Sequence, residues 1–153
     1  MLDHTDIRLL KALQKDARLT SSELGDILNL SPSQSARRRA ALQAEGYIDG
    51  FSVRLDPVHL GLNVQAFVQV SMVTHTPRSA GRFQSLIRTR EEVVSAWTLT
   101  GEADYLLRVY CADLQALNRL VHEVFLPHDA VARVQSQIVM DQTKADAPLP
   151  IHL

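Results

Sequence analysis

Two helix-start signals close together most strongly constrain how this chain can fold. The segment 20–23 reads TSSE, and the segment 31–34 reads SPSQ. In each, a serine or threonine that can cap a helix is followed three residues later by a glutamate or glutamine that can cap in return. Pro32 suits the first position of the second helix, and Asn29 tolerates the left-handed conformation that ends the first. The sequence therefore predicts two helices joined by a tight turn.

A further helix is predicted before these two, over 3–16. Asp3 can cap it, and its leucines recur on one side at helical spacing. The helix that starts at Ser31 should continue to Gly46, because glycine suits the position just after a helix. Two short helices joined by a tight turn match the helix-turn-helix unit, in which the later helix enters the major groove of DNA.

The helix from Ser31 carries three adjacent arginines. If Leu42 points inward, a turn of about 100° per residue places Ser33, Arg37 and Ala40 outward and the other two arginines on the flanks. Base contacts are expected from Ser33, Gln34 and Arg37, and mainly phosphate contacts from Ser22, Arg38, Arg39 and Arg54. The alternatives are that the arginines form a solvated helix surface, and that Arg54 merely faces water.

The remaining hundred residues read as strands and helices in alternation. Residues 64–73 alternate apolar and polar side chains, as a strand does, and a helix is expected over 79–90. Two strand-like runs follow at 93–99 and 104–111, separated by the short connection TGEA. Asp113 can cap a helix that Pro127 ends, and a last strand spans about 131–140. This βαββαβ order is the ferredoxin-like arrangement, with four antiparallel strands and both helices on one face.

The expected fold class is therefore α+β, with an N-terminal helix-turn-helix (winged-helix-like) domain and a ferredoxin-like βαββαβ domain. We expect the first domain over 1–50, a linker over 51–63 with a short strand at 51–55, and the ferredoxin-like domain over 64–143. Residues 144–153 lack periodicity, so a loose tail is expected there.

The predicted sheet has one face without a covering layer. Its strands nevertheless carry apolar residues on both sides, for example Tyr105 and Leu107 against Leu106 and Tyr110. Apolar burial contributes roughly 25 cal/mol per Å², so such a face should pair with a second copy. We therefore expect an obligate homodimer, which would also place two helix-turn-helix units on two half-sites of DNA.

Composition limits the other possibilities. The chain has 153 residues, a formal net charge of -1 and a pI of about 6.6, which argues against binding polyanions with the whole surface. It has no apolar run of membrane-spanning length, and its N-terminus is acidic where a secretory signal would be basic. Cys111 is the one cysteine, which excludes intrachain disulfides and Cys-based zinc sites. We expect a cytoplasmic protein with no membrane contact, no metal and no cofactor.

Five stretches of the chain, in their order and spacing, carry a resemblance to a known family. They are LDHTDIRLLKALQKDARLT, ELGDILNLS, RRAALQAEGYIDGF, LTGEADYLL and VQSQIVMDQTK. Together they resemble the Lrp/AsnC (feast/famine) family of bacterial and archaeal transcription regulators, over nearly the whole chain. The resemblance implies a recognition helix over 31–45, a double-stranded DNA partner, a small effector that is typically an amino acid, and dimers that assemble further, often to octamers.

The resemblance also implies an effector site. Gly101 and Asp104 match the family's effector-loop glycine and acid, and a hairpin loop offers backbone amides to a carboxylate while Asp104 accepts from an ammonium. The same turn contains Thr98, Leu99, Thr100 and Glu102, and Leu126 and Ser136 of another subunit are expected to complete the pocket. The alternative is a plain tight turn in which Gly101 serves backbone geometry alone.

This chain departs from the family at a few positions. Arg39 stands where relatives usually have an apolar residue, and Ala103 is small where many have an aromatic one, which reshapes the expected pocket. Gly25 and Asn29 replace a usual alanine and a usual glycine, and we expect the fold to tolerate both changes.

Two other functions remain open at this stage. Some proteins that resemble this family decarboxylate sirohaem-type tetrapyrroles, so an enzyme is the main alternative. Its acid or ligand would come from six histidines that show no paired metal spacing: His4, His59, His75, His122, His128 and His152. The third possibility is a ligand-binding module without DNA function, which requires a degenerate helix-turn-helix. The favoured hypothesis is a sequence-specific, effector-responsive transcription regulator that is not an enzyme.

Overall fold

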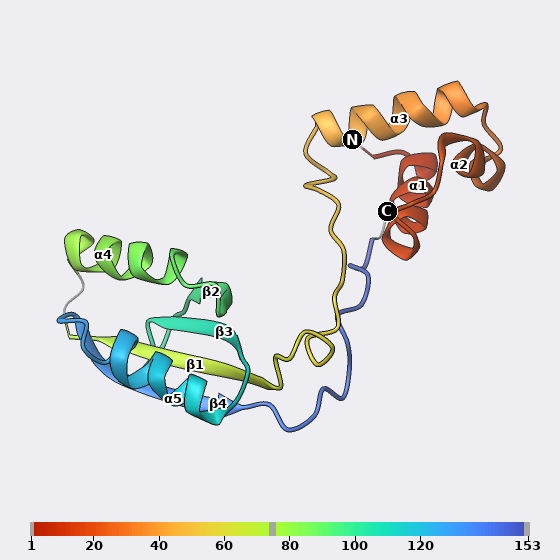
Figure 1. Ribbon diagram of the computed structural model, residues 1–153. Helices are drawn as coiled ribbons and strands as arrows, with labels where there is room; N and C mark the ends of the chain where they lie inside the picture. Colours follow the sequence, from red (N-terminus) through yellow and green to blue (C-terminus); the bar gives the residue numbers. More distant parts are fainter. Residues whose placement is uncertain (1, 74–75, 152–153) are drawn as a thin grey trace. The chain divides into compact units, whose positions relative to one another are not determined.

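The computed structural model describes residues 2–73 and 76–151 of the chain, which form two compact units (Figure 1). The first unit contains the residues up to Arg54 together with the segment from Thr143 onward, and the second unit runs from Leu55 to Gln142. Of the candidate histidines, His75 and His152 lie outside the described residues.

The first unit is built from three helices: α1 (His4–Lys15), α2 (Ser21–Leu28) and α3 (Pro32–Ala44). Each begins at the residue that the sequence predicted as its cap, Asp3, Thr20 or Ser31, and in each the capping box is reciprocal. These boxes satisfy backbone N–H groups that have no partner within the helix. The helices enclose one apolar cluster, which consists of Leu9, Leu10, Leu13, Leu24, Leu28 and Leu42.

The turn between α2 and α3 is tight. Asn29 ends α2 with φ of 58°, in the left-handed region that the sequence indicated. A Cβ atom on Gly25 would lie 2.6 Å from the carbonyl oxygen of Leu30. The fold tolerates Gly25, as expected, and in this chain the position favours glycine because a methyl group there would collide with backbone.

The second unit contains a four-stranded sheet and its helices. Along the chain these are β1 (Val64–Met72), α4 (Pro77–Arg88), β2 (Val93–Thr98), β3 (Tyr105–Cys111), α5 (Leu114–Arg119), the π-helix η1 (Leu120–Phe125) and β4 (Val131–Ile138). The strands lie in the order β2-β3-β1-β4, and every pair is antiparallel. The predicted βαββαβ arrangement is confirmed.

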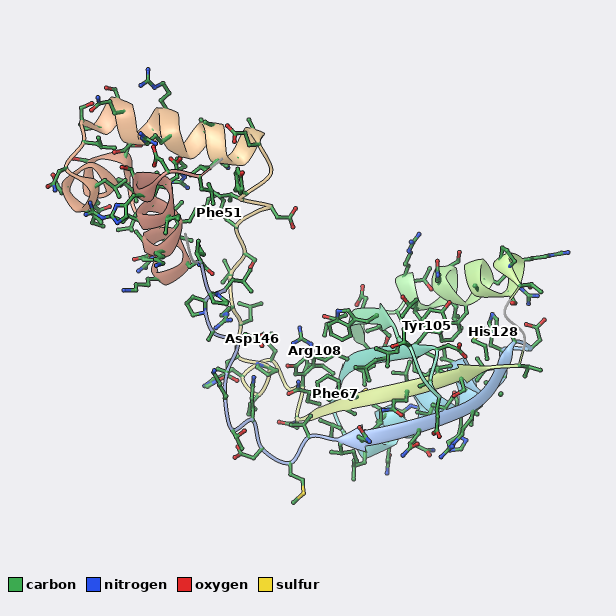
Figure 2. The ribbon with its side chains drawn as sticks, turned by 180° about the vertical axis from the view of Figure 1, so that it is seen from behind. Phe51, Phe67, Tyr105, Arg108, His128 and Asp146 are labelled. Carbon is green, nitrogen blue, oxygen red and sulfur yellow. The ribbon has the colours of Figure 1, made fainter. Side chains whose placement is uncertain are left out.

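Both helical segments pack on one face of this sheet. The buried cluster joins Phe83 of α4 and Phe125 of η1 to Val68 of β1 and Leu107 of β3. Tyr105 lies between the sheet and α4, with its ring 5.0 Å from that of Phe83 (Figure 2). Along β1 and β3 the alternate residues are only half-buried, as on a sheet with one face uncovered.

Three expectations need correction. Residues 51–55 are extended but are not paired as a strand, because the described chain offers them no partner strand. The helix after Asp113 widens halfway into the π-helix η1, where the N–H of Leu126 bonds to the carbonyl of Val121. The last segment is not a loose tail, because residues from Thr143 onward are part of the first unit.

Candidate functional site

The outward face of α3 is the candidate nucleic-acid surface. Ser33, Arg37 and Ala40 are exposed, whereas Ser35 and Leu42 are buried, so the predicted orientation of the helix is confirmed. Ser35 is fully buried and its Oγ has no partner within the described residues, which fits a small side chain held against the helical core. Arg37 therefore projects from a helix whose inner side is fixed.

The two arginines on the flanks of α3 have partners within the first unit. Arg38 Nη1 donates to Asp3 Oδ2 at 2.7 Å and to Asp6 Oδ1 at 2.6 Å. Arg39 Nη1 donates to the carbonyl of Leu19 at 3.1 Å, and its guanidinium carbon lies 4.8 Å from the centre of the Phe51 ring. Each arginine thus ties α3 to another part of the unit, and phosphate contact by either stays a prediction.

The contacts between Arg38 and Asp3 also shift the pKa values of both groups. The pKa of Asp3 is lowered first by the backbone N–H of Asp6 and then by the guanidinium of Arg38. The hydrogen bonds to Asp3 and Asp6 raise the pKa of Arg38. The Asp3 carboxylate therefore stays ionised at neutral pH, and it caps α1 while pairing with α3.

The other predicted DNA contacts have different surroundings. Ser22 is exposed on α2. Gln34 uses its side-chain oxygen in the capping box, accepting from the N–H of Ser31 at 3.0 Å, which leaves its amide nitrogen outside the box. Arg54 Nη2 donates to the carbonyl of Asp146 at 2.8 Å. All three side chains are at the surface, and their DNA contacts stay predictions.

The turn between β2 and β3 is the candidate effector loop. Gly101 has φ of +119°, a conformation that other residues rarely adopt, although a Cβ atom there would meet nothing within 4 Å. Thr98, Leu99, Thr100 and Glu102 are exposed beside it. In the described part of the chain, the backbone N–H groups of Thr100, Gly101 and Glu102 have no recorded acceptor. The turn therefore has backbone donors that the described residues leave available to a ligand.

Asp104 fixes this turn to the end of β1. Its Oδ2 accepts from the N–H of Met72 at 2.7 Å, and its own N–H donates to the carbonyl of Val70 at 2.9 Å. The carbonyl of Glu102 accepts from the hydroxyl of Ser71 at 3.0 Å. Asp104 thus has a structural role that the sequence did not indicate, since it depends on a strand more than thirty residues earlier.

Leu126 and Ser136 do not join this loop within one chain. Ser136 lies on β4, where it pairs with Val68 of β1. The strands β4 and β2 are at opposite edges of the sheet. Leu126 follows η1 and is 38% exposed. Their predicted participation therefore requires another subunit.

A cavity that the sequence did not indicate lies between α4 and β2. It has a volume of about 450 Å³, and its lining includes Gln84, Arg88, Trp97, Thr98 and Tyr105. Gln84 Nε2 donates to the hydroxyl of Tyr105 at 3.4 Å. Thr98 is the predicted effector residue that reaches this cavity. Neither the helical spacing on α4 nor the strand patterns of β2 and β3 gave a signal for the other four.

Other site types are not supported by the described residues. Among them no three His, Cys, Asp or Glu side chains gather as metal ligands. Nor does any helix among these residues combine the length and the hydropathy needed to cross a membrane.

Comparison with known proteins identifies the family of each domain. Residues 2–49 match the winged helix-turn-helix DNA-binding family, and residues 65–149 match the Lrp/AsnC ligand binding domain. An uncharacterized HTH-type transcriptional regulator, y4tD of Sinorhizobium fredii, is 34% identical over 99% of this chain and 90% of its own length. The DNA-binding transcriptional activator DecR of Escherichia coli is 32% identical over 99% of each chain. A crystal structure of a transcriptional regulator from Neisseria meningitidis, in complex with L-Met, aligns with a TM-score of 0.93 and 36% identity over 98% of this chain and 97% of that one.

A capped helix-turn-helix followed by a ferredoxin-like ligand-binding domain defines the protein as an HTH-type transcriptional regulator. Its relatives and its domain matches span nearly all of its length. The chain belongs to the Lrp/AsnC family of transcription regulators.

Proposed function

We propose that this regulator reads a specific DNA sequence through the outward face of α3 and changes its DNA binding in response to an amino acid. The observation that carries the proposal is the position of Arg37, which projects from α3 while its two neighbouring arginines are tied to the first unit. A guanidinium in the major groove can bond to both acceptors of a guanine, and the exposed Ala36 and Ala40 allow close approach to thymine methyl groups.

Around this contact, Ser33 and the amide nitrogen of Gln34 address bases at the start of α3. Phosphate contacts come from Ser22, Arg38, Arg39 and Arg54. A guanidinium has five N–H donors, so each arginine keeps donors that its intramolecular partners do not use. Phosphate contacts supply register and affinity, whereas Arg37 and its neighbours supply sequence preference.

The effector proposal depends on the β2–β3 turn. Its outward N–H groups at Thr100, Gly101 and Glu102 suit a carboxylate, and the second oxygen of Asp104 suits an ammonium. Thr98 and Leu99 flank the site, and Leu126 and Ser136 come from a neighbouring subunit. The relative from Neisseria meningitidis was solved with L-Met, which supports the amino-acid class.

Assembly is part of the same proposal. Phe67, Leu106 and Tyr110 lie half-buried on the uncovered sheet face, and Trp97 is 45% exposed there. Stable homodimers commonly bury more than about 2,000 Å², which a four-stranded face can supply. The segment 51–55 carries Val53 and Leu55, which are 82% and 67% exposed. Such exposure suits a strand that pairs with a strand of another subunit. We infer a homodimer that assembles further, works in the cytoplasm and has no enzymatic activity.

The DNA proposal is tested by Arg37→Ala on a selected operator and on random duplex. We expect a loss of about 1 to 3 kcal/mol on the operator and a much smaller loss on random DNA, because a bidentate base contact carries sequence information. Arg119→Ala, an exposed arginine of the second unit, is the matched control. An equal loss on both duplexes would assign Arg37 to the DNA backbone.

The effector proposal is tested by thermal shift against the common amino acids, since a ligand that binds only the folded state raises its apparent stability. Sedimentation with and without the best ligand then reports assembly. Unchanged stability, assembly and DNA affinity across the whole set would remove the effector role. A protein that sediments as a monomer at micromolar concentration would contradict the proposed homodimer.

A further inference from the structure

The C-terminal segment 146–151 docks in a groove of the first unit. A cavity of about 720 Å³ lies between α1, the start of the linker and this segment. Its walls include Leu10 and Leu13 of α1 and the aromatic rings of Tyr47 and Phe51. Figure 1 and Figure 2 show the segment running beside the start of the linker.

Gln14 holds the segment through its backbone. The side-chain oxygen of Gln14 accepts from the N–H of Leu149 at 2.6 Å, and its side-chain nitrogen donates to the carbonyl of Leu149 at 3.2 Å. One amide side chain thus satisfies both backbone groups of one residue, as a neighbouring strand would. The Leu149 side chain itself is 76% exposed, so backbone recognition rather than burial of this leucine fixes the segment.

The sequence of the segment suits this mode of binding. It reads DAPLPI, and the prolines at 148 and 150 bias Ala147 and Leu149 toward extended conformations. Proline-bearing extended segments dock in grooves lined by aromatic rings because little conformational entropy is lost. Ile151 then anchors the end by packing against the leucine cluster of the first unit.

Because this segment docks on the first unit, the chain connects the two units by two passages rather than one. The chain leaves the first unit after Arg54 and returns to it at Thr143. Arg54 and Asp146, one on each passage, are joined by a hydrogen bond of 2.8 Å. Any change in the second unit that pulls on the passage after β4 therefore acts on the docked segment as well as on the linker.

The groove also leads to α3. Phe51 lines the groove and carries the guanidinium of Arg39 over its ring, and the same guanidinium donates to the carbonyl of Leu19. The C-terminal segment and Phe51 line the same cavity, and Phe51 lies three residues before Arg54, which bonds to Asp146 of the segment. The start of the linker therefore joins the segment to the helix that presents Arg37. Arg39 connects α3 to this route.

We propose that segment 146–151 is a strap whose docking orders Phe51 and Arg39 and thereby positions α3 for DNA. Undocking loosens the start of the linker and lowers DNA affinity. The second unit can therefore act on α3 through this segment as well as through the linker. The DNA consequence rests on the function proposed above, whereas the docking itself does not.

The test compares the full-length wild type with Gln14→Ala, with a chain that ends at Ala147, and with Phe51→Ala. Gln115→Ala, an exposed glutamine on α5, is the matched control. Hydrogen exchange followed by mass spectrometry reports order in residues 47–54, and titration with operator DNA reports affinity. Losing the Gln14 bonds should speed exchange there by about 5-fold, since a net hydrogen bond contributes roughly 1 kcal/mol.

We expect Gln14→Ala and the shortened chain to speed exchange at 47–54 and weaken DNA binding by a similar factor. Phe51→Ala should weaken DNA binding while leaving Gln14 and Leu149 paired. Unchanged exchange at 47–54 in the shortened chain would overturn the strap. Faster exchange with unchanged DNA affinity would overturn its link to α3. If the wild type binds no DNA at all, the proposed function fails, while the exchange data still decide whether the strap docks.

Discussion

Arg38 Nη1 lies 2.6 Å from Asp6 Oδ1, although the two residues are thirty-two positions apart in the sequence. Asp6 also closes the capping box of α1, with its Oδ2 accepting from the N–H of Asp3 at 3.1 Å. The same carboxylate therefore starts one helix and holds another. Since α3 presents Arg37, this contact links the stability of the first unit to the geometry of its DNA-facing surface.

The neighbouring arginines Arg37 and Arg38 should give opposite phenotypes when changed to alanine. Arg38→Ala leaves Asp3 and the largely buried Asp6 without their cation, so we expect the free energy of unfolding to fall by about 1 kcal/mol. Arg37→Ala should leave unfolding unchanged, because Arg37 is exposed and has no recorded ion pair within the described residues. Chemical denaturation of both variants checks this, and equal stabilities would show that the Arg38 pair contributes nothing in solution.

Acid should destabilise the first unit through its capping carboxylates. The pKa of Asp3 is lowered from its ordinary value of 3.8 by the N–H of Asp6 and by Arg38, and that of Glu23 from 4.5 by the N–H and hydroxyl of Thr20. A lowered folded-state pKa gives stability that is fully present above the unfolded value and is lost as pH falls through the folded one. The loss should therefore set in below about pH 4.5 and grow below about pH 4.

Thermal unfolding between pH 7 and pH 3, followed by far-UV circular dichroism, measures this loss. Asp3→Asn keeps a capping side chain but removes the titrating carboxylate, so its unfolding should depend less on pH than that of the wild type. Asp26→Asn, on the exposed side of α2, is the control. If both variants showed the wild-type pH dependence, the capping carboxylate would not be its source.

Gly25 should resist replacement more than its helical position suggests. Gly25→Ala brings a methyl group within 2.6 Å of the Leu30 carbonyl, so the turn before α3 must shift, at about 1 to 3 kcal/mol. Gly81→Ala is the matched control, because Gly81 lies in α4 and a Cβ atom there meets nothing within 4 Å. That change should stabilise by up to about 1 kcal/mol through helix propensity. Equal effects of the two alanines on the melting temperature would contradict the close approach seen at Gly25.

Local chemistry explains which parts of the fold could be predicted from the sequence. Thr20 with Glu23 and Ser31 with Gln34 are three residues apart, so their capping boxes can be read directly from the chain. The alternation along β1 likewise predicted a strand, and the structure buries the face that carries Val68. Short-range patterns of this kind need no knowledge of the tertiary structure.

The features that were missed all depend on distant partners. The docking of Leu149 on Gln14 joins residues 135 positions apart, and no local pattern in a proline-bearing end segment announces it. Arg39 could be placed on the flank of α3, but its position over Phe51 depends on how the linker leaves the helix. The π-helix η1 follows from packing rather than from any break in the apolar periodicity before Pro127.

Asp104 allows structure and ligand recognition to be separated in the effector loop. Asp104→Asn keeps an oxygen that can accept from the N–H of Met72 at 2.7 Å but removes the negative charge, so we expect the melting temperature without ligand to change little. If Asp104 also binds the ammonium of an amino acid, the variant should lose most of the ligand-induced thermal shift, because charge-assisted hydrogen bonds are roughly twice as strong as neutral ones. Asp104→Ala removes both functions and should lower the melting temperature as well. A full ligand-induced shift in Asp104→Asn would restrict Asp104 to holding the turn against β1.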